Sequence, residues 1–497
     1  MKKIIISLVF LLLIIAFFIG FIEIDNTKEV ARGEGIVYSV DKIPNNLSTI
    51  TNLSKRDEDI ICATSKGLVE KDMEGNVAPS LARDMVIKDE GIEYEFTLND
   101  DIYWNDGSKI DVSDISNFFK ELIKEEDESN IEAILDIYGA KEFKDGKTTF
   151  EKGVAISTEG NIIKIRLNKK NENFMSELTK PQYRIRKNIP LWSNLNKSYK
   201  NIVYSGEYYI SSVGEGNIQL ARNKKYSGSG PEKISILEDE NEELAMASFE
   251  IGNRDVVLNP PKSQLSRLSN DNKLITFPSN EGKYLAMRGD NENLSAIDRR
   301  EIYKIIYEAT EGFEGENPER IEVAEGSYFR EDKEDLTKLQ TRKVSINKEE
   351  EWKKPEVINL LAKDNDDNRD YCKYLVSWFK DKEGINLRYS LVSEEELKDV
   401  ELQKRYGVIL FNANAYGKER LEFYKNIESI LSGDEKKLFN EELIKGDFNF
   451  TKIEEELFSN YRILPIMFLN NNVAISDRIS SISSDGNGNI DFNGIWK

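Results

Sequence analysis

The hydrophobic pattern in the first half of the chain predicts a compact unit of mixed strands and helices. Alternate residues are apolar over 92–98 and again over 163–167, which is the period of a half-buried strand. Between them, apolar residues recur three and four positions apart over 115–123, as on one face of a helix. Asn105-Asp106-Gly107 has the composition of a tight turn, and Asp111 can cap the helix that follows. We therefore expect a small α+β unit here.

A different pattern begins after about residue 350. It predicts, in order, a strand at 357–362, a helix at 368–381 ended by Gly384, a strand at 385–391, a short helix at 394–399 and a strand at 406–411. This alternation indicates parallel strands joined by right-handed crossovers. Such sheets bind ligands at the carboxyl ends of their strands. We therefore expect a site near the loops after Leu361, Leu391 and Leu410.

The N-terminus carries an export signal. Two lysines precede residues 4–22, whose apolar character is broken only by Ser7 and Gly20. As a helix this run spans about 28 Å, close to the hydrocarbon thickness of a bilayer. No A-x-A cleavage motif follows it, and bulky apolar residues crowd its end. These features favour an uncleaved signal anchor over 1–22, a polar tether over 23–34 and a cell-membrane protein with its bulk outside. Secretion after cleavage is the alternative, and a buried core helix would require a very large groove.

Composition excludes several classes of function. The chain of 497 residues has no histidine, which removes Ser-His-Asp and Cys-His catalysis and His-ligated metal sites. Cys62 and Cys372 are too few for a four-thiolate site, and we expect two separate free thiols. A net charge of −21 argues against nucleic acid as a partner. We expect no cofactor, no metal and no enzymatic activity.

Two acidic segments resemble calcium loops only at first sight. Residues 364–368 and 485–489 lack the glycine and glutamate that a calcium loop needs at its sixth and twelfth positions. We interpret the first as a helix cap or solvated loop and the second as a hairpin turn.

A set of motifs spread over residues 35–497 resembles one known family. They are Gly67-Leu68-Val69-Glu70, the segment from Gly75 to Ala82, Tyr94 to Leu98, Trp104 to Gly107, Asp111 to Ile115, Ser205-Gly206-Glu207-Tyr208, Leu220 to Tyr226, and Leu464 to Phe468. In order and spacing they are similar to the extracellular solute-binding proteins of ABC importers, family 5, which are receptors for oligopeptides, dipeptides and nickel.

The resemblance implies a fold of the α/β class. It is a two-lobed, periplasmic-binding-protein-like (type II) architecture with a hinge, here preceded by one N-terminal apolar helix. Lobe I would comprise residues 35–280 and 465–497, with an inserted α+β subdomain over about 77–195. Lobe II would comprise residues 281–464.

The resemblance also implies a ligand site. Peptide receptors of the family have a W-x-x-D segment in the second lobe, whose aspartate pairs with the α-ammonium of the peptide. The matching residues here are Phe411-Asn412-Ala413-Asn414, so Asn414 replaces the acid. We expect Phe411, Asn412 and Asn414 to bind ligand, together with Phe468 on the returning strand. The lost charge predicts weaker binding of free amino termini or a different ligand. The nickel branch is disfavoured because no histidine is available.

Three functions follow from these features. The first is capture of a peptide-like small solute for ABC permease subunits in the membrane. The second is a diverged, membrane-tethered binding, sensor or scaffold protein that no longer feeds transport. The third is an enzyme, for which no pair of carboxylates stands out.

Overall fold

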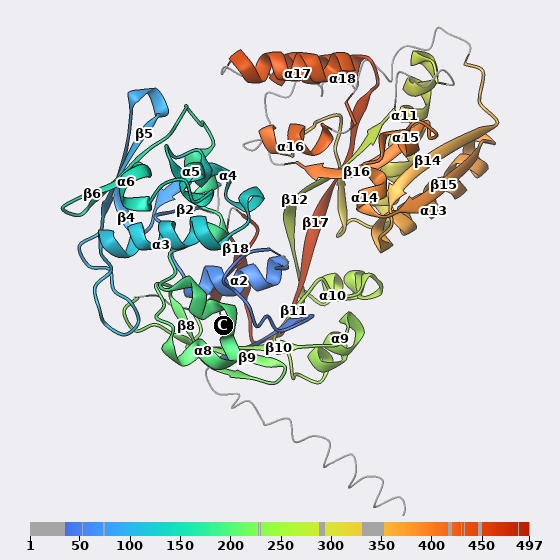
Figure 1. Cartoon of the computed structure of the whole chain (residues 1–497). Coiled ribbons are helices and arrows are strands. Elements are labelled where there is room, and N and C mark those ends of the chain that lie inside the picture. Colours follow the sequence, from blue (N-terminus) through green and yellow to red (C-terminus); the bar gives the residue numbers. More distant parts are fainter. Residues whose placement is uncertain are drawn as a thin grey trace, which may run out of the picture. The chain divides into compact units, whose positions relative to one another are not determined.

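The computed structural model describes residues 35–496 except 52, 73–74, 227, 229, 288–293, 331–351, 416–419, 429, 432, 446–449 and 486 (Figure 1). The predicted anchor and tether over residues 1–34 lie outside the described residues. Among those described, no helix has both the length and the apolar character needed to cross a membrane.

The chain forms two compact units. The first contains residues up to 262 together with those from 474 onward, and the second contains residues 263–473. The chain therefore passes between them twice, once after Lys262 and once within strand β17 (Ile463–Ile475).

The first unit contains two larger sets of paired strands with different strand directions, besides two separate two-stranded antiparallel sheets. In one, ordered β11-β1-β10-β9-β8, β1 is parallel to both neighbours and the β9 and β8 pairings are antiparallel; the other, ordered β4-β5-β7-β6, is wholly antiparallel. The strands are β1 (Gly35–Val40), β2 (Val69–Lys71), β3 (Val77–Pro79), β4 (Ala82–Lys88), β5 (Glu93–Leu98), β6 (Ile156–Glu159), β7 (Ile162–Arg166), β8 (Tyr208–Gly214), β9 (Asn217–Arg222), β10 (Lys233–Glu238), β11 (Val256–Leu258), β18 (Ser481–Ser484) and β19 (Ile490–Trp496). The helices are α2 (Lys55–Thr64), α3 (Val112–Glu125), α4 (Glu132–Leu135), α5 (Ala140–Lys144), α6 (Phe150–Gly153), α7 (Phe174–Glu177), α8 (Leu195–Ser198) and α9 (Glu242–Glu250).

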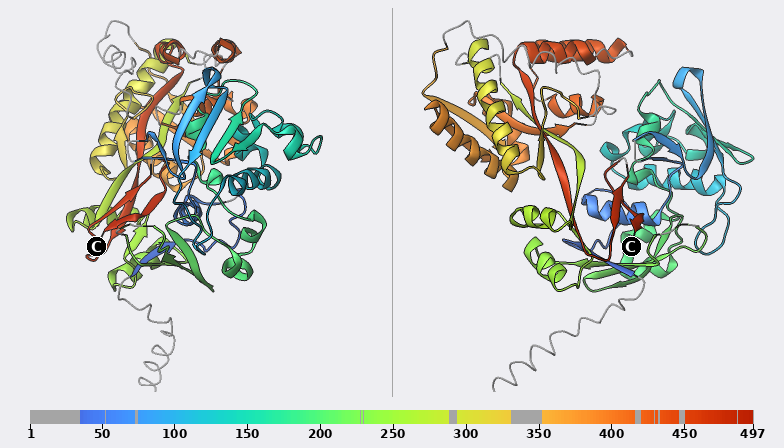
Figure 2. Two further views of the ribbon diagram at one scale, coloured as in Figure 1. Left: turned by 90° about the vertical axis from the view of Figure 1, so that its left-hand side faces the viewer. Right: turned by 180° about the vertical axis from the view of Figure 1, so that it is seen from behind.

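The antiparallel sheet and α3 lie side by side (Figure 2), and their side chains share a hydrophobic core. Alternate residues of β5 are buried in it, and the apolar face of α3 covers it. The Asp111 carboxylate accepts hydrogen bonds from the backbone amides of Ser113 and Asp114 and so caps α3. The predicted strand, helix and cap are confirmed.

The second unit contains a mixed sheet ordered β15-β14-β16-β12-β17, with β13 paired to β17. Its strands are β12 (Leu274–Ala286), β13 (Ile321–Val323), β14 (Val357–Lys363), β15 (Asn386–Val392), β16 (Val408–Asn414) and β17. Its helices are α10 (Leu265–Asn270), α11 (Ala296–Glu316), α13 (Asp366–Trp378), α14 (Glu394–Leu397), α15 (Val400–Gln403), α16 (Arg420–Ile427), α17 (Gly433–Lys445) and α18 (Phe450–Ser459). Strand β14 is parallel to β15 and β16, which confirms the predicted parallel pairing.

Several boundaries in this unit differ from the prediction, and two of them bear on the site and on the end of α13. Strand β16 does not end at Phe411 but continues to Asn414, because β12 pairs with it over the whole of residues 409–414. The expected site loop after Leu410 is therefore strand. Helix α13 ends at Trp378 and passes into a π-helical turn over Phe379–Glu383. Gly384 closes this turn in the left-handed conformation, as predicted.

The two cysteines are free thiols, as predicted. Cys62 lies in α2 of the first unit and is partly exposed, whereas Cys372 lies in α13 of the second and is buried.

Gly206, from one of the family-like motifs, lies where two backbones nearly touch. Its amide donates to the carbonyl of Thr64 at the end of α2, at 2.9 Å. A Cβ at this position would lie 2.2 Å from the backbone carbon of Thr64 and 2.4 Å from the amide nitrogen of Ser65. Backbone atoms cannot rotate away as the end of a side chain can, so only glycine fits.

We predict that Gly206→Ala destabilises the first unit by about 2 kcal/mol or more, because α2 and the start of β8 must separate. Gly160→Ala is the matched control, since that site is open but has a φ of +60°. The control should cost only the strain of a left-handed residue, about 1 kcal/mol. Urea unfolding followed by circular dichroism measures both. Equal losses for the two variants would contradict the close-approach explanation.

Candidate functional site

The two aromatic residues of the predicted site lie in the core of the second unit. Phe411, on β16, is 4% exposed and its ring stacks on Tyr284 of β12, with centroids 5.7 Å apart. Phe468, on β17, is 3% exposed, and the guanidinium of Arg330 lies over its ring at 5.3 Å. Strand β12 separates β16 from β17. The ligand role of both phenylalanines stays a prediction.

The two asparagines of the predicted site lie on the other face of β16. In the antiparallel register, Asn412 is opposite Lys283 and Asn414 is opposite Glu281. Directly opposite side chains lie close together on the same face of a sheet. These four side chains therefore form one polar cluster at the carboxyl end of β16.

Lys283 is the buried centre of this cluster. Its side chain is 2% exposed, and its ammonium donates to Asn368 Oδ1 at 2.5 Å and to Asn412 Oδ1 at 3.2 Å. Both acceptors are neutral amide oxygens. Burial lowers the pKa of Lys283 to about 8, against the opposing effect of the nearby Asp367 and Glu281 carboxylates. The site therefore contains a desolvated cation with no carboxylate bound to it directly.

The neighbouring structure fixes the orientation of both amides. Asn368, in the first turn of α13, donates its Nδ2 to the carbonyl of Lys363 at the end of β14. Its oxygen is thereby turned toward Lys283. Asn412 donates its Nδ2 to Glu281 Oε2 at 3.2 Å while its oxygen accepts from Lys283. A continuous chain of hydrogen bonds runs from the buried Asn368 to the exposed Glu281.

The exposed end of the cluster can recognise a polar solute. Glu281 and Asn412 are exposed and Asn414 is partly exposed. They present a carboxylate and two amides, which can accept hydrogen bonds from an ammonium or an amide and donate to a carbonyl. Among the described residues, no group of three or more Cys, Asp or Glu side chains could hold a metal ion.

Sequence reasoning found Asn412 and Asn414 but missed Lys283, Glu281 and Asn368. The only signal for Lys283 was a charged residue at the start of the apolar run Tyr284 to Met287. Its partners are 85 and 129 positions away, and the register of two strands brings them together.

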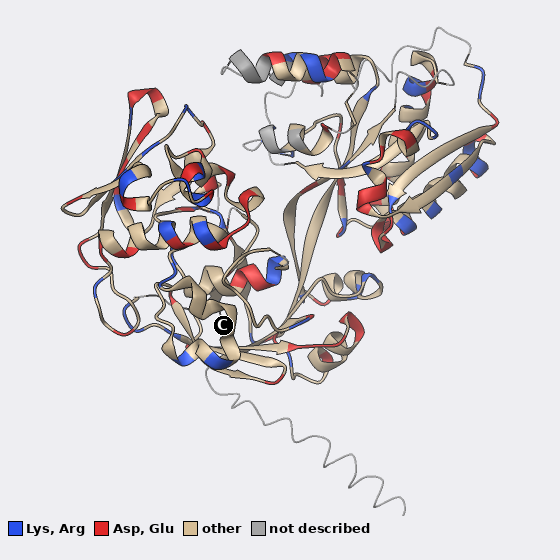
Figure 3. Cartoon of the chain, viewed as in Figure 1, with Lys and Arg blue, Asp and Glu red and all other residues tan. Residues whose placement is uncertain are grey.

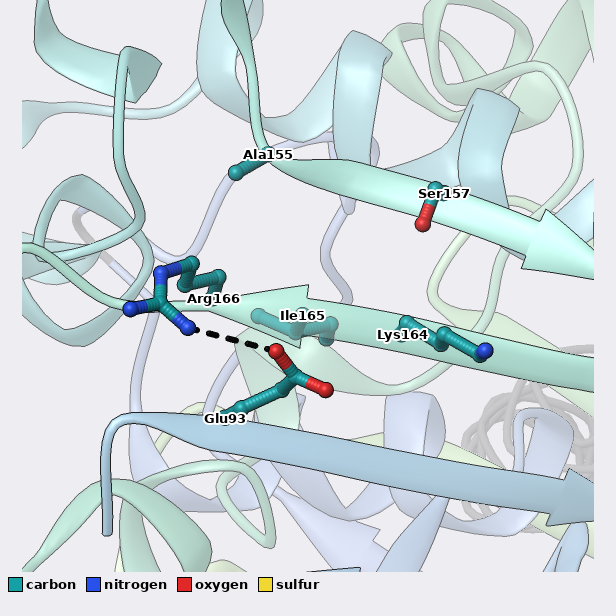
Figure 4. A pocket seen from close by; sticks show the side chains of 6 residues that line it. All are labelled: Glu93, Ala155, Ser157, Lys164, Ile165 and Arg166. Carbon is teal, nitrogen blue, oxygen red and sulfur yellow. Dashed lines mark hydrogen bonds and ion pairs between the residues drawn. The ribbon is translucent and has the colours of Figure 1, made fainter. Parts of the chain in front are cut away.

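A hollow of about 210 Å³, separate from the polar cluster, lies over the antiparallel sheet of the first unit (Figure 4). Arg166 in its lining pairs with Glu93 at 3.3 Å and with Asp89 at 2.7 Å. Lys164 pairs with Glu159 at 2.6 Å. The charged side chains that line this hollow are thus already paired with one another or with neighbouring carboxylates. The hollow is therefore a weaker candidate for a ligand site than the polar cluster around Lys283.

Comparison with known proteins identifies the family. The model of the bacterial extracellular solute-binding proteins, family 5, matches residues 76–429. This chain belongs to that family. The resemblance inferred from the sequence motifs is confirmed.

Two oligopeptide-binding proteins of streptococci are similar to parts of this family 5 protein. SarA of Streptococcus gordonii is 24% identical over 203 residues, which cover 38% of this chain and 30% of SarA. AliB of Streptococcus pneumoniae is 32% identical over 79 residues, which cover 16% of this chain and 12% of AliB. The matches thus span less than a third of either relative.

Solved structures share the fold over nearly the whole chain. The unliganded open form of MppA, a periplasmic murein tripeptide binding protein, has a TM-score of 0.72 at 16% identity and covers 94% of this chain and 98% of its own. NikA from Brucella suis has a TM-score of 0.70 at 14% identity and covers 93% of this chain and 100% of its own. The mixed α/β fold therefore matches the two-lobed periplasmic solute-binding proteins.

The buried ammonium gives this family 5 protein a specific dependence of stability on pH. The folded-state pKa of Lys283 is about 8, below its usual 10.5. Between these values the unfolded chain binds more protons, so the contribution of Lys283 to stability rises with pH. We predict that the unfolding free energy of the wild type, minus that of Lys283→Met, increases by about 3 kcal/mol from pH 7 to pH 10.5.

Urea unfolding of both proteins across this range measures the difference. Other titrating groups cancel, because they are common to both chains. A difference that does not change with pH would show that Lys283 is not desolvated.

Proposed function

We propose that this chain is the extracellular substrate-binding component of an ABC importer. It captures a peptide-like solute and delivers it to permease subunits in the membrane. The observation that carries the proposal is the family 5 match over residues 76–429. The names of SarA and AliB as oligopeptide-binding proteins support peptides as the solute class.

The polar cluster of the second unit supports the same proposal. Asn412 and Asn414 lie at the carboxyl end of β16, which is parallel to β14, and the carboxyl ends of such strands are where α/β sheets bind ligands. Glu281 lies directly opposite Asn414 on the antiparallel strand β12. In this proposal two lobes close by a hinge on the solute, and residues 4–22 hold the protein at the cell membrane.

A diverged sensor or scaffold is the second candidate. It is favoured by Asn414, which stands where peptide receptors of the family have an acid. Such a protein retains the fold but has lost coupling to transport. The identity of the bound molecule separates the two candidates.

We predict that the purified chain carries a peptide-like solute. Native mass spectrometry of protein isolated without a denaturing step should show a bound mass that is released on unfolding. Fragmentation then identifies it. If the protein is repeatedly isolated without a bound mass, and titration with a mixed peptide library gives no heat, the peptide assignment is wrong.

We predict that Asn414→Asp increases the affinity for peptides with a free amino terminus about tenfold, because a charged hydrogen bond replaces a neutral one. Amino-acetylated peptides should gain nothing. Asn386→Asp is the matched control, since it adds the same charge to an exposed position at the start of β15. Calorimetric titration gives the affinities. An equal gain for acetylated peptides, or for the control variant, would contradict a role for Asn414 at the amino terminus.

A further inference from the structure

A hollow of about 450 Å³ lies beside the outermost strand of the second unit. Asn359 of β14 and Arg388 and Ser390 of β15 line one side, and Arg405 and Tyr406, which lead from α15 into β16, line another. Leu402 and the ring of Tyr406 add apolar surface. The hollow therefore combines polar hydrogen-bonding groups with an apolar wall, and it contains no acidic side chain.

Pairing between strands places the donors together. Asn359 and Arg388 are directly opposite in the parallel register of β14 and β15. Tyr406 donates its hydroxyl hydrogen to Ser390 Oγ at 2.9 Å. The hydroxyl hydrogen of Ser390 is then available to a ligand, beside the two guanidinium groups.

The two arginines differ from all others in the described part of the chain. Arg388 and Arg405 are exposed, and neither guanidinium makes a hydrogen bond or an ion pair with any residue that the structure describes. Even the buried Arg186 donates to backbone carbonyls. In a chain with 90 acidic residues and 69 basic ones, two unpaired arginines in one hollow are unexpected.

The acids around the hollow are already engaged by other groups. Figure 3 shows α14 in red because of Glu394, Glu395 and Glu396. Glu394 pairs with Lys363 and Lys398, and Glu396 accepts from the backbone amide of Ser393. On α15, Glu401 pairs with Lys404 at 2.6 Å, and its cap Asp399 accepts from backbone amides. Glu395 is the exception, and it does not line the hollow.

The hollow is separate from the polar cluster around Lys283. The chain crosses from β14 outward to β15 through α13, and returns from β15 to β16 through α14 and α15. Right-handed crossovers in opposite directions place their helices on opposite faces of the sheet. Lys283 bonds to α13, whereas Leu402 and Arg405 belong to the α15 side. The two sites therefore lie on different faces.

We propose that this hollow binds a phosphate ester. Two guanidinium groups supply paired donors and a charge that matches a doubly charged phosphate better than a single carboxylate. The volume lies within the range of small-molecule sites and exceeds the needs of bare phosphate, so Leu402 and the ring of Tyr406 can contact the organic group. The ester can come from a soluble metabolite or from a lipid headgroup, which share this chemistry. The proposal goes beyond solute capture and does not depend on it.

The experiment is a calorimetric titration of the full chain in a neutral detergent at low salt, with glycerol 3-phosphate, inorganic phosphate and acetate as probes. We expect glycerol 3-phosphate to bind best and acetate not to bind. Arg388→Gln and Arg405→Gln should each weaken binding about tenfold or more, and the double variant should abolish it. Arg369→Gln is the matched control, because Arg369 lies in the same unit but is paired with Asp364 and Asp366.

Two further readings make the result decisive. Unchanged urea unfolding of the double variant shows that it is folded. Phosphatidic acid, whose headgroup is also a phosphate monoester, is added to the micelles to distinguish the sources: competition with glycerol 3-phosphate in the wild type indicates a lipid headgroup, and its absence indicates a soluble ester. The proposal is overturned if the wild type does not bind glycerol 3-phosphate, if acetate binds equally well, or if Arg369→Gln weakens binding as much as the hollow variants.

Discussion

The polar cluster of the second unit depends on how the buried ammonium group of Lys283 is solvated. A buried lysine must replace the water it has lost with fixed oxygen atoms, or it releases its proton. Here amide oxygens of Asn368 and Asn412 take that role, and the Asn368 amide is itself held by the carbonyl at the end of β14. The requirement of Lys283 for acceptors thus ties together β12, β14, β16 and the first turn of α13. The exposed amide of Asn412 is oriented by a group that solvent does not reach.

The same arrangement explains how a family fold can persist while the polar face of these strands changes. Identities of 14–16% accompany TM-scores of 0.70–0.72 in two solved relatives, because the pattern of buried apolar positions is enough to specify the sheet and its helices. Phe411 and Tyr284 stack on the apolar side of the β12–β16 pair. Substitutions on the opposite face of the same pair leave this stack intact. Charge at Glu281 and Asn414, which reach solvent, can therefore vary without disturbing this stack, whereas Asn412 is tied to the buried Lys283.

Elements that depend on nearby residues were predicted well from the sequence. Features that depend on residues far away along the chain were predicted less well. The capping residue Asp111, the alternation in β5, the parallel pairing of β14 and the turn at Gly384 depend on neighbours within a few positions or on general rules of chain crossing. The extension of β16 to Asn414 required pairing with a segment about 130 residues earlier. For the same reason neither the partners of Lys283 nor the lack of partners for Arg388 and Arg405 could be predicted. A residue's own identity does not reveal which side chains the register places beside it.

The distribution of the two cysteines has a practical consequence. Each unit contains one thiol, and burial raises the pKa of Cys372 to about 12 and that of Cys62 well above its usual range. The thiolate is the form that reacts with alkylating reagents, and Cys372 is in addition buried, so its sulfur is protected while α13 stays packed in its unit. The natural sequence therefore contains a chemical probe of the second unit. The rate at which Cys372 is labelled measures how often that unit opens locally, and the partly exposed Cys62 gives the rate of a thiol that reagents reach without unfolding.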